Sequence, residues 1–379
     1  MEFGWTDKQL ARYDQVLDAT KLAFPDPPGA GHGFFGRKDW LALGDLGMLG
    51  ACLPEEYGGG GLGALDTARV VEAVGRGCPD TGLVFAAAAH TFACAMPIAA
   101  FGSAAVRRRL LPGLAAGRLI AGNAMTEPEA GSDSSALTTT ATRVDGGWLL
   151  DGTKSFVTNG PVSDVFVTYA TVNPRAGFLG VTGFVVDRGA EGVVVGPPHE
   201  KMGMLSVPAG SVTFEDCFVP EEQVLGAVGG GAAIFQHSMG WERACLFALY
   251  VGLLDRLLEQ CVRHARSRRQ FGRRISEFQA VSHRIADIKL RLESARLLLY
   301  RACWSMDRGE PSVLEIALSK LAVSEGVLAS ATDAVRVFGG RGYLREDGIE
   351  AALRDAVPST IFSGTSDIQR ELIVKEMGL

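Results

Sequence analysis

The spacing of apolar residues along the chain changes twice, and each change marks a predicted change of structure. Over residues 1 to about 119, apolar residues recur every three or four positions, which is the spacing of helices that bury one face. A Pro/Gly-rich loop at 24–33 interrupts this pattern. Helices are expected over Thr6–Leu22 and near 37–48, 64–77, 82–100 and 103–117.

From about 120 to 227, apolar and polar residues alternate over short runs, as they do in β-strands. Asp151-Gly152 is a hairpin-turn signal between the runs Trp148–Leu150 and Ser155–Thr158, and Asn159-Gly160 ends the second run. Such short runs predict a small antiparallel barrel or sandwich. Further strands are expected at Val165–Ala170, Phe184–Val186, Val193–Val195 and Ser211–Phe214.

From Gly229 to the end, helical spacing returns. The helices are expected near 232–266, 277–307, 311–338 and 366–377. The order of helices, strands and helices, without alternating βαβ units, argues against a doubly wound nucleotide-binding sheet. The chain is therefore predicted to be an α+β multidomain protein. Its expected domains are an N-terminal helical domain at 1–119, a middle β domain at 120–228 and a C-terminal helical domain at 229–379.

Composition narrows the function without changing this organisation. The chain is 47% hydrophobic and 21% charged with a net charge of −6, which gives no reason to expect a nucleic-acid partner. Its seven cysteines are scattered without Cys-x-x-Cys spacing, so neither a metal site nor a disulfide framework is expected. Together with an N-terminus that lacks signal-peptide features, this favours the reducing cytoplasm.

One segment resembles a membrane span and another resembles a dinucleotide-binding motif, but the residues in and around each segment argue against these interpretations. Gly82–Phe101 is apolar and nearly long enough to cross a bilayer, but it is mostly alanine, contains His90 and Pro97, and leads into Arg107–Arg109. We expect a buried core helix and no membrane span. Gly58–Gly63 matches G-x-G-x-x-G but follows no strand, so it is interpreted as a flexible loop.

Four segments carry candidate chemistry. Met125–Asp133 offers small and hydroxyl residues that can line a flat polar ring or an anion. Within Asp151–Gly160, alternation puts Phe156 and Thr158 on one face, an arrangement that suits a flavin ring. Arg268–Gly272, followed by Phe278-Gln279-Ala280, has an arginine that can neutralise a diphosphate. In Ile361–Arg370, Ser366 and Gln369 have capping-box spacing, which predicts a helix start with free N–H groups.

These segments, taken in order, carry a family resemblance. Pro-Glu-Glu-Tyr-Gly-Gly, Thr-Glu-Pro-x-Ala-Gly-Ser-Asp, Arg-x-x-Phe-Gly and Gly-Thr-Ser-x-Ile-Gln span nearly the whole chain and resemble the acyl-CoA dehydrogenase family. The resemblance implies that family's fold, in which a helical domain and a β-barrel or sandwich precede a C-terminal four-helix bundle. It also implies FAD as the cofactor and a homo-oligomer, most often a tetramer built as a dimer of dimers.

The resemblance also assigns flavin contacts. The flavin would be met by Met125, Thr126, Gly131, Ser132, Phe156 and Thr158, and Thr365 and Asp367 also fall on flavin-contact positions. A neighbouring subunit would add its Arg268, Gln270, Phe271, Gln279, Arg336 and Gly340. Two positions depart from the family's usual pattern, since Phe156 replaces a tryptophan and Asp367 replaces a frequent glutamine.

The implied chemistry removes a proton from the carbon α to a thioester while hydride leaves the β carbon for flavin N5. Its base should be a carboxylate whose pKa is raised in an apolar pocket. Many family members carry this glutamate directly before Gly-Thr of the last motif, where this chain has Ser363. Glu242 is a lone acid in an apolar helix, and isovaleryl-CoA-type members have their base at a similar position, directly before an arginine.

Glu242 is therefore the predicted base, and pairing of Glu242 with Arg243 or Arg354 is the alternative. Ser363 is expected to donate its backbone N–H to the thioester oxygen, and Arg243 is placed with it on the substrate side. His90 is either a hydrogen-bonded core histidine or a group that senses the substrate.

A narrower resemblance concerns the substrate. Val84–His90, Met239–Phe247, Ile285–Trp304 and Ile361–Ser366 resemble bacterial dehydrogenases that oxidise L-proline, tethered to the phosphopantetheine arm of a peptidyl carrier protein, to a pyrrole-2-carboxyl thioester. Proline is crowded at its α carbon, and serine at 363 frees space there. Branched acyl chains are crowded in a similar way.

Three hypotheses remain open from the residues alone. The first is a prolyl-carrier-protein dehydrogenase, and the second is a short- or branched-chain acyl-CoA dehydrogenase with CoA as the donor. The third is a flavin-binding docking or regulatory homologue that catalyses no dehydrogenation.

Overall fold

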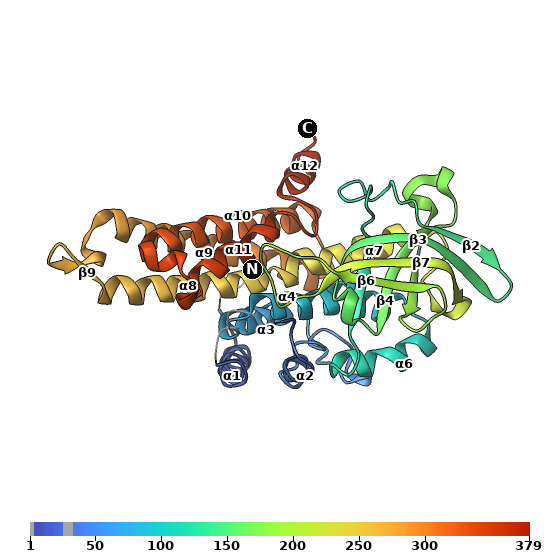
Figure 1. Cartoon of the computed structure of the whole chain (residues 1–379), viewed down its shortest axis with the longest axis horizontal. Coiled ribbons are helices and arrows are strands. Elements are labelled where there is room, and N and C mark those ends of the chain that lie inside the picture. The colour runs from blue at the N-terminus through green and yellow to red at the C-terminus, as the bar shows by residue number, and fades with distance from the viewer. Residues whose placement is uncertain (1–3, 26–32) are drawn as a thin grey trace.

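The computed structural model describes residues 4–25 and 33–379, and its first third is helical, as the spacing predicts (Figure 1). The predicted loop at 24–33 lies largely outside the described residues. Thr6 caps the first helix through a capping box with Gln9. The helices of this region are α1 (Asp7–Ala23), α2 (Arg37–Asp45), α3 (Ala64–Gly77), α4 (Thr81–Ala89), α5 (Met96–Phe101) and α6 (Ala104–Ala115).

Helices α4 and α5 form one continuous rod through a π-helical turn at His90–Ala95. In the part of the chain that the structure describes, Thr81–Phe101 is the one helix long and apolar enough to cross a membrane, and 89% of its apolar window is buried inside the protein. The prediction of a buried core helix is thus confirmed. The segment Gly58–Gly63 follows a short 3-10 turn, Glu55–Tyr57, rather than a strand.

His90 belongs to this core. Its Nε2 lies 3.2 Å from the Leu114 carbonyl oxygen, and its Nδ1 accepts a hydrogen bond from the Ala121 N–H at 2.9 Å. Burial lowers the pKa of His90 to about 4, which keeps the ring neutral. Both ring nitrogens are engaged by backbone groups, so the structure supports the core interpretation of His90.

The middle region is an eight-stranded sheet in the order β6-β7-β3-β2-β4-β5-β8, with β1 beside β4. Most neighbours are antiparallel, but β1 and β2 pair with β4 in parallel, so the expectation of a purely antiparallel sheet was wrong. The strands are β1 (Ala121–Ala124), β2 (Thr140–Val144), β3 (Gly147–Thr158), β4 (Val165–Thr171), β5 (Val181–Asp187), β6 (Val193–Pro198), β7 (Ala209–Pro220) and β8 (Val224–Leu225).

The predicted hairpin turn at Asp151-Gly152 was also wrong, because β3 runs straight through it. Gly152 adopts φ 143° beside a shift of register between β3 and β7. A Cβ at this glycine would lie 2.6 Å from the hydroxyl oxygen of Thr139, so the neighbouring backbone needs glycine here. The turn that joins β2 to β3 is instead formed by an earlier Asp-Gly pair, Asp145-Gly146.

The last region consists of long helices, of which α8, α9 and α10 pack together and extend away from the sheet as a rod (Figure 1). Helix α11 packs against α8 and α10 and completes a four-helix arrangement. The expected helix at 232–266 is split by a π-helical turn, Glu242–Leu246, and α11 was not predicted. The elements are α7 (Gly231–Trp241), α8 (Ala248–Ser267), α9 (Gln279–Asp307), α10 (Val313–Phe338), α11 (Ile349–Ala356), α12 (Ser366–Glu376) and the hairpin β9 (Arg269–Gln270) and β10 (Arg273–Arg274).

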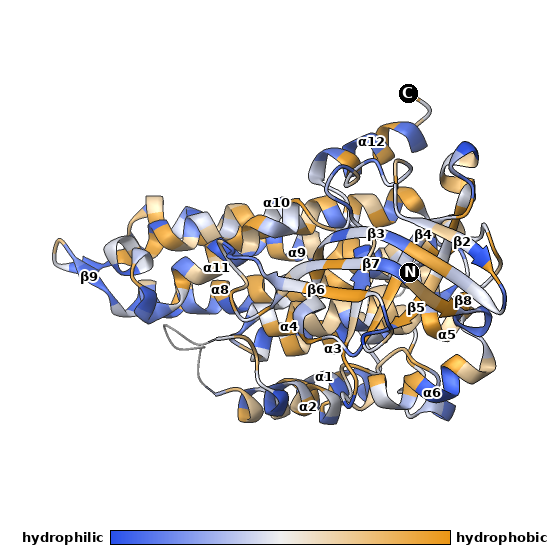
Figure 2. Ribbon diagram, turned by 45° about the vertical axis from the view of Figure 1, so that its right-hand side comes forward, coloured by the Kyte–Doolittle hydropathy of each residue, from blue (hydrophilic) through white to orange (hydrophobic). Residues whose placement is uncertain are grey.

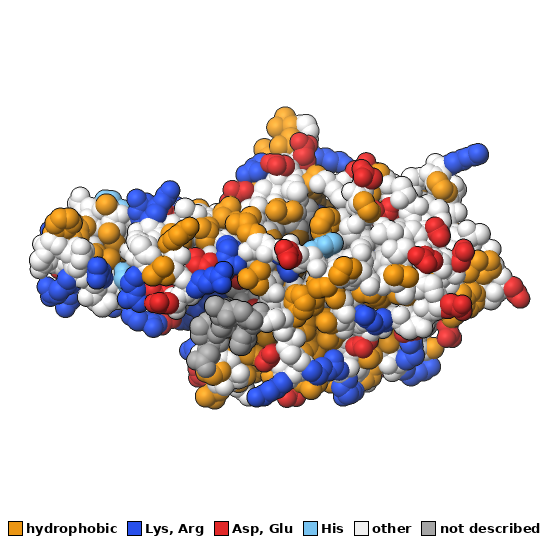
Figure 3. All heavy atoms as spheres, in the orientation of Figure 1, with side chains coloured by type: hydrophobic (Ala, Val, Ile, Leu, Met, Phe, Trp, Pro, Cys, Tyr) orange, Lys and Arg blue, Asp and Glu red, His pale blue; other side chains and the backbone are white. Residues whose placement is uncertain are grey.

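The main core joins the helical regions to one face of the sheet, and a second core fills the space behind the other face. Figure 2 shows hydrophobic residues along strands β4 and β5, whereas the hairpin around β9 is hydrophilic. On the surface, basic side chains gather at the narrow end of the molecule that carries this hairpin (Figure 3). The sheet and the hairpin lie at opposite ends of the molecule (Figure 1).

Candidate active site

Glu242, the predicted base, is in contact with Ser363, which stands where many family members have their base. Glu242 opens the π-helical turn and is 7% exposed. The hydroxyl of Ser363 donates a hydrogen bond to Glu242 Oε1 at 2.9 Å. The other carboxylate oxygen, Oε2, is buried and has no partner among the described residues. One oxygen is thus oriented by serine while the other remains available to a ligand.

Burial raises the pKa of Glu242 to about 7, against the opposing effects of the Ser363 hydrogen bond and the Arg243 charge. A carboxylate with this pKa is a far stronger base than an ordinary glutamate, and about half of it is ionised at neutral pH. The electrostatics of Glu242 therefore suit proton abstraction.

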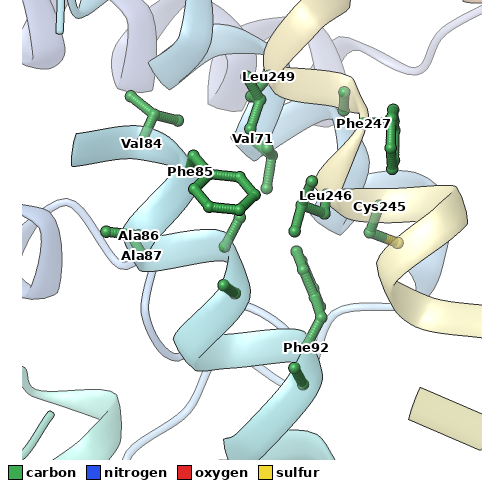
Figure 4. Close-up of a cluster of buried hydrophobic side chains, with 14 of the residues drawn as sticks. Val71, Val84, Phe85, Ala86, Ala87, Phe92, Cys245, Leu246, Phe247 and Leu249 are labelled. Atoms are coloured by element: carbon green, nitrogen blue, oxygen red, sulfur yellow. The ribbon is translucent and has the colours of Figure 1, made fainter. Parts of the chain in front are cut away.

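The surroundings of Glu242 explain this burial. Figure 4 shows apolar side chains from α4 and from the segment after Glu242, with Phe85 and Leu246 directed toward one another. The ring of Phe362, directly before Ser363, lies 4.6 Å from that of Phe85 and 5.3 Å from that of Phe247. These rings pack together beside the two residues, Glu242 and Ser363, that hydrogen-bond each other.

The backbone at Ser363 is held in an unusual shape. Ser363 has φ 54° and Gly364 has φ 86°, so two successive residues are left-handed. Arg243 Nε donates to the Ser363 carbonyl oxygen at 2.9 Å, and the side-chain amide of Gln369 donates to that of Gly364 at 3.1 Å. Arg243, expected on the substrate side, thus holds the loop that presents Ser363.

Helix α12 starts after this loop, but its cap differs from the prediction. The side chain of Thr365 accepts a hydrogen bond from the Ile368 N–H at 3.2 Å, so Thr365 is the N-cap. The predicted capping box between Ser366 and Gln369 was wrong by one position, since the hydroxyl of Ser366 is buried without a partner in the described chain. The free N–H groups expected here are therefore partly occupied.

The first group of expected flavin residues lies around β3. Met125 and Thr126 follow β1, and the Ser155 N–H donates to the Thr126 carbonyl oxygen at 2.7 Å. Gly131 and Ser132 are exposed farther along the same loop. Thr158 ends β3.

Phe156 provides an observation that favours a bound ring. It is 68% exposed and has φ 56°, so a large apolar side chain is held outward on a costly backbone. A flat aromatic cofactor would cover this side chain. The residues around β3 therefore fit a flavin.

An ion pair that sequence reasoning missed holds this loop. Lys154 Nζ is fully buried and donates to Glu127 Oε1 at 2.7 Å, to the Tyr169 carbonyl oxygen at 2.7 Å and to that of Met125 at 3.3 Å. Burial opposes ionisation of Glu127, but the Lys154 charge and hydrogen bonds from Thr138 and Thr139 lower its pKa to about 2. The only sequence signal was a lysine within an otherwise strand-like run.

The second group of expected flavin residues lies at the far end of the rod. Phe271, in the turn between β9 and β10, is 93% exposed with φ 51°. The His264 and Phe338 rings stack at 4.2 Å, which brings α8 and the end of α10 together. Arg268, Gln270, Gln279, Arg336 and Gly340 are exposed in this neighbourhood.

Because the hairpin and β3 lie at opposite ends of the molecule, one chain cannot bring both groups to one flavin (Figure 1). Thr365 and Asp367 lie at the start of α12. This separation agrees with the expectation that the two groups meet between subunits.

Replacing Ser363 with alanine should raise the pKa of Glu242, because the serine hydroxyl is a donor that favours the charged form. The rate of substrate-dependent flavin reduction should still rise with pH, but its midpoint should move upward by about one pH unit, the worth of one hydrogen bond to a charge. The pH profile of kcat/KM measures this midpoint.

Thr360→Val is the matched control, because the hydroxyl of Thr360 donates to the nearby Val357 carbonyl oxygen. Its midpoint should equal that of the unmodified protein. An unchanged midpoint in Ser363→Ala would contradict the assignment of Glu242 as the titrating base.

Three domain families match the chain. They are the acyl-CoA dehydrogenase N-terminal domain over residues 20–118, the middle domain over 122–217 and the C-terminal domain over 229–378.

Relatives and solved structures agree with these matches. An L-prolyl-[peptidyl-carrier protein] dehydrogenase of Pseudomonas fluorescens is 59% identical over 380 residues, covering 100% of both chains. One from a Serratia species is 46% identical over 340 residues, which is 90% of this chain and 88% of the relative. The solved structure "PigA with FAD and proline" is 41% identical with a TM-score of 0.96, covering 100% of both chains. With its fold, its three matched domains and these relatives, the chain belongs to the acyl-CoA dehydrogenase family.

Proposed function

We propose that the protein is an FAD-dependent dehydrogenase that oxidises L-prolyl-S-peptidyl carrier protein to pyrrole-2-carboxyl-S-carrier protein. The observation that carries the proposal is the contact between Glu242, a buried carboxylate with a pKa of about 7, and Ser363, which occupies the position of the more usual base. The names of the two relatives at 59% and 46% identity support the substrate.

Each residue has a part in the reaction. Glu242 takes the α proton through its free oxygen Oε2, and Ser363 holds the carboxylate in place through Oε1. The backbone N–H of Ser363 donates to the thioester oxygen, where negative charge develops, while Arg243 fixes the same residue through its carbonyl oxygen. Bound FAD supplies a hydride acceptor for the β carbon.

Residues around β3 of one subunit and residues at the hairpin end of another would together hold FAD. The first subunit contributes Met125, Thr126, Gly131, Ser132, Phe156, Thr158, Thr365 and Asp367. The neighbouring copy contributes its Arg268, Gln270, Phe271, Gln279, Arg336 and Gly340. The separation of these groups within one chain supports a homo-oligomer, which we propose to be a tetramer (Figure 1).

The donor is a phosphopantetheinyl peptidyl carrier protein rather than CoA. The protein acts in the cytoplasm, an environment that suits its seven free cysteines. Among the described residues no group of three or more His, Cys, Asp or Glu side chains could hold a metal ion.

Mass spectrometry of prolyl-loaded carrier protein after incubation with the holoenzyme tests the proposal. The expected product is lighter by about four hydrogens, since two successive two-electron oxidations convert the ring to a pyrrole. Isovaleryl-CoA serves as the comparison substrate. Faster flavin reduction by isovaleryl-CoA would favour the branched-chain acyl-CoA alternative, and a yellow protein that no thioester reduces would favour a non-catalytic docking role.

A further inference from the structure

A buried tyrosine close to the base lacks a hydrogen-bond partner. Tyr169, on β4, is 1% exposed, and its hydroxyl has no partner among the described residues. Buried hydroxyl groups are nearly always hydrogen-bonded, because water is lost on burial and must be replaced. An unpaired hydroxyl next to a candidate active site therefore suggests that a ligand completes it.

Tyr169 is held firmly in place. Its carbonyl oxygen accepts a hydrogen bond from Lys154 Nζ at 2.7 Å, and its ring packs edge-on against Phe235 with the centroids 6.0 Å apart. A Cβ at Gly183, on the neighbouring strand β5, would touch the ring at 3.6 Å. The hydroxyl is thus fixed by the packing of the ring and not by a bond of its own.

The strand that carries Tyr169 is linked to the base by packing through one intervening turn. Strand β4 packs against the π-helical turn His90–Ala95, which in turn packs against the π-helical turn that begins with Glu242. Burial raises the pKa of Tyr169 further above its usual value, and the charges of Cys94 and Glu242 add to this effect. The phenol consequently stays protonated and serves as a hydrogen-bonding group rather than a base.

Two buried polar atoms thus have no partner among the described residues, Glu242 Oε2 and the Tyr169 hydroxyl, and the Glu242 charge acts on Tyr169. Proline suits such a pair, because its nitrogen is bonded directly to the carbon that Glu242 deprotonates, at about 1.5 Å. When that carbon lies against Glu242, the nitrogen is necessarily near it. A phenol can donate to the lone pair of this nitrogen or accept from its N–H.

We propose that the Tyr169 hydroxyl hydrogen-bonds the ring nitrogen of the prolyl group and so selects proline over carbon rings and branched chains of the same size. The inference rests on the proposed function and adds a specificity residue to it. An apolar pocket distinguishes shapes of equal size poorly, whereas a buried hydroxyl left unpaired by a carbon ring penalises that ring strongly.

The test compares two carrier-protein substrates, prolyl and cyclopentanecarbonyl, by anaerobic flavin reduction with the holoenzyme. The Tyr169→Phe variant should lose about 10- to 100-fold in rate with the prolyl substrate. Its rate with the cyclopentanecarbonyl substrate should be unchanged or higher. The melting temperature of the free variant should be unchanged or raised, because the substitution removes an unpaired buried hydroxyl.

Tyr300→Phe is the matched control. Tyr300 is also a buried tyrosine, but its hydroxyl donates to Glu72. This variant should melt at a lower temperature and keep the same preference between the two substrates. A Tyr169→Phe variant that slows both substrates equally, or neither, overturns the inference while the proposed function stands. An unmodified protein that does not oxidise the prolyl substrate overturns both.

Discussion

Replacing Glu242 with glutamine is expected to slow substrate-dependent flavin reduction by about 10²- to 10⁴-fold, the usual contribution of a general base. Glutamine keeps the size of the side chain and can still accept the Ser363 hydrogen bond, but it cannot take a proton. FAD should remain bound, because Glu242 is not among the proposed flavin contacts. Stopped-flow absorbance of the flavin measures the rate, and the visible spectrum measures FAD content.

The same variant has a predicted effect on stability. Burial raises the pKa of folded Glu242 from the usual 4.5 to about 7, so between these values the folded state binds more protons than the unfolded state. Stability therefore falls as pH rises through this window and stays reduced above it. The Glu242→Gln variant lacks this loss of stability. The melting temperature of the variant minus that of the unmodified protein should therefore increase from pH 5 to pH 8.

Glu259→Gln is the control, because Glu259 lies on α8 and pairs with Arg263 at the surface. It should change neither the rate of reduction nor the pH dependence of melting. Undiminished flavin reduction in Glu242→Gln would mean that another group is the base.

The second large effect concerns Lys154, whose replacement by methionine should release FAD. The change leaves the carboxylate of Glu127 buried beside an apolar side chain, which costs about 3–5 kcal/mol of the free energy of unfolding. The link from β3 to the Met125 carbonyl oxygen is lost as well, so the flavin loop loosens. Titration of FAD by fluorescence and unfolding in urea measure the two effects.

Two further variants sharpen this prediction. The double variant Lys154→Met/Glu127→Gln removes the unpaired charge and should recover much of the stability but little of the FAD affinity, because the loop contact is still missing. Lys289→Met breaks an exposed pair with Glu293 and should change stability by less than about 1 kcal/mol. Equal effects at Lys154 and Lys289 would show that the buried pair has no special role.

The long helices and the order of the three regions could be predicted from sequence because amphipathic spacing and caps are local properties. The short helix α11 has only eight residues, fewer than the window over which helical spacing is normally recognised. The hairpin was misplaced because both Asp151-Gly152 and Asp145-Gly146 carry the same turn signal. Only the packing of Thr139 against Gly152 decides between them, and that contact is not local.

The candidate site shows a similar division. Glu242 could be proposed as the base because it is an isolated acid among apolar residues and because Ser363 occupies the more usual position. Nothing local predicted that these two residues hydrogen-bond, since they lie 121 positions apart. Lys154 and Tyr169 were missed because their roles depend on which strands lie beside β3 and β4.

The π-helical turn at Glu242–Leu246 limits how this chain can change its length. Such a turn contains one residue more than the α-helical path, so it rotates α7 relative to α8 by about 100°. Deleting one residue from the turn would restore a regular helix and swing Glu242 away from Ser363, although every functional side chain would still be present. We therefore expect an insertion or deletion in this stretch to abolish activity even where Glu242 and Arg243 are kept, so that the orientation of the base depends on the number of residues in the turn as much as on their identity.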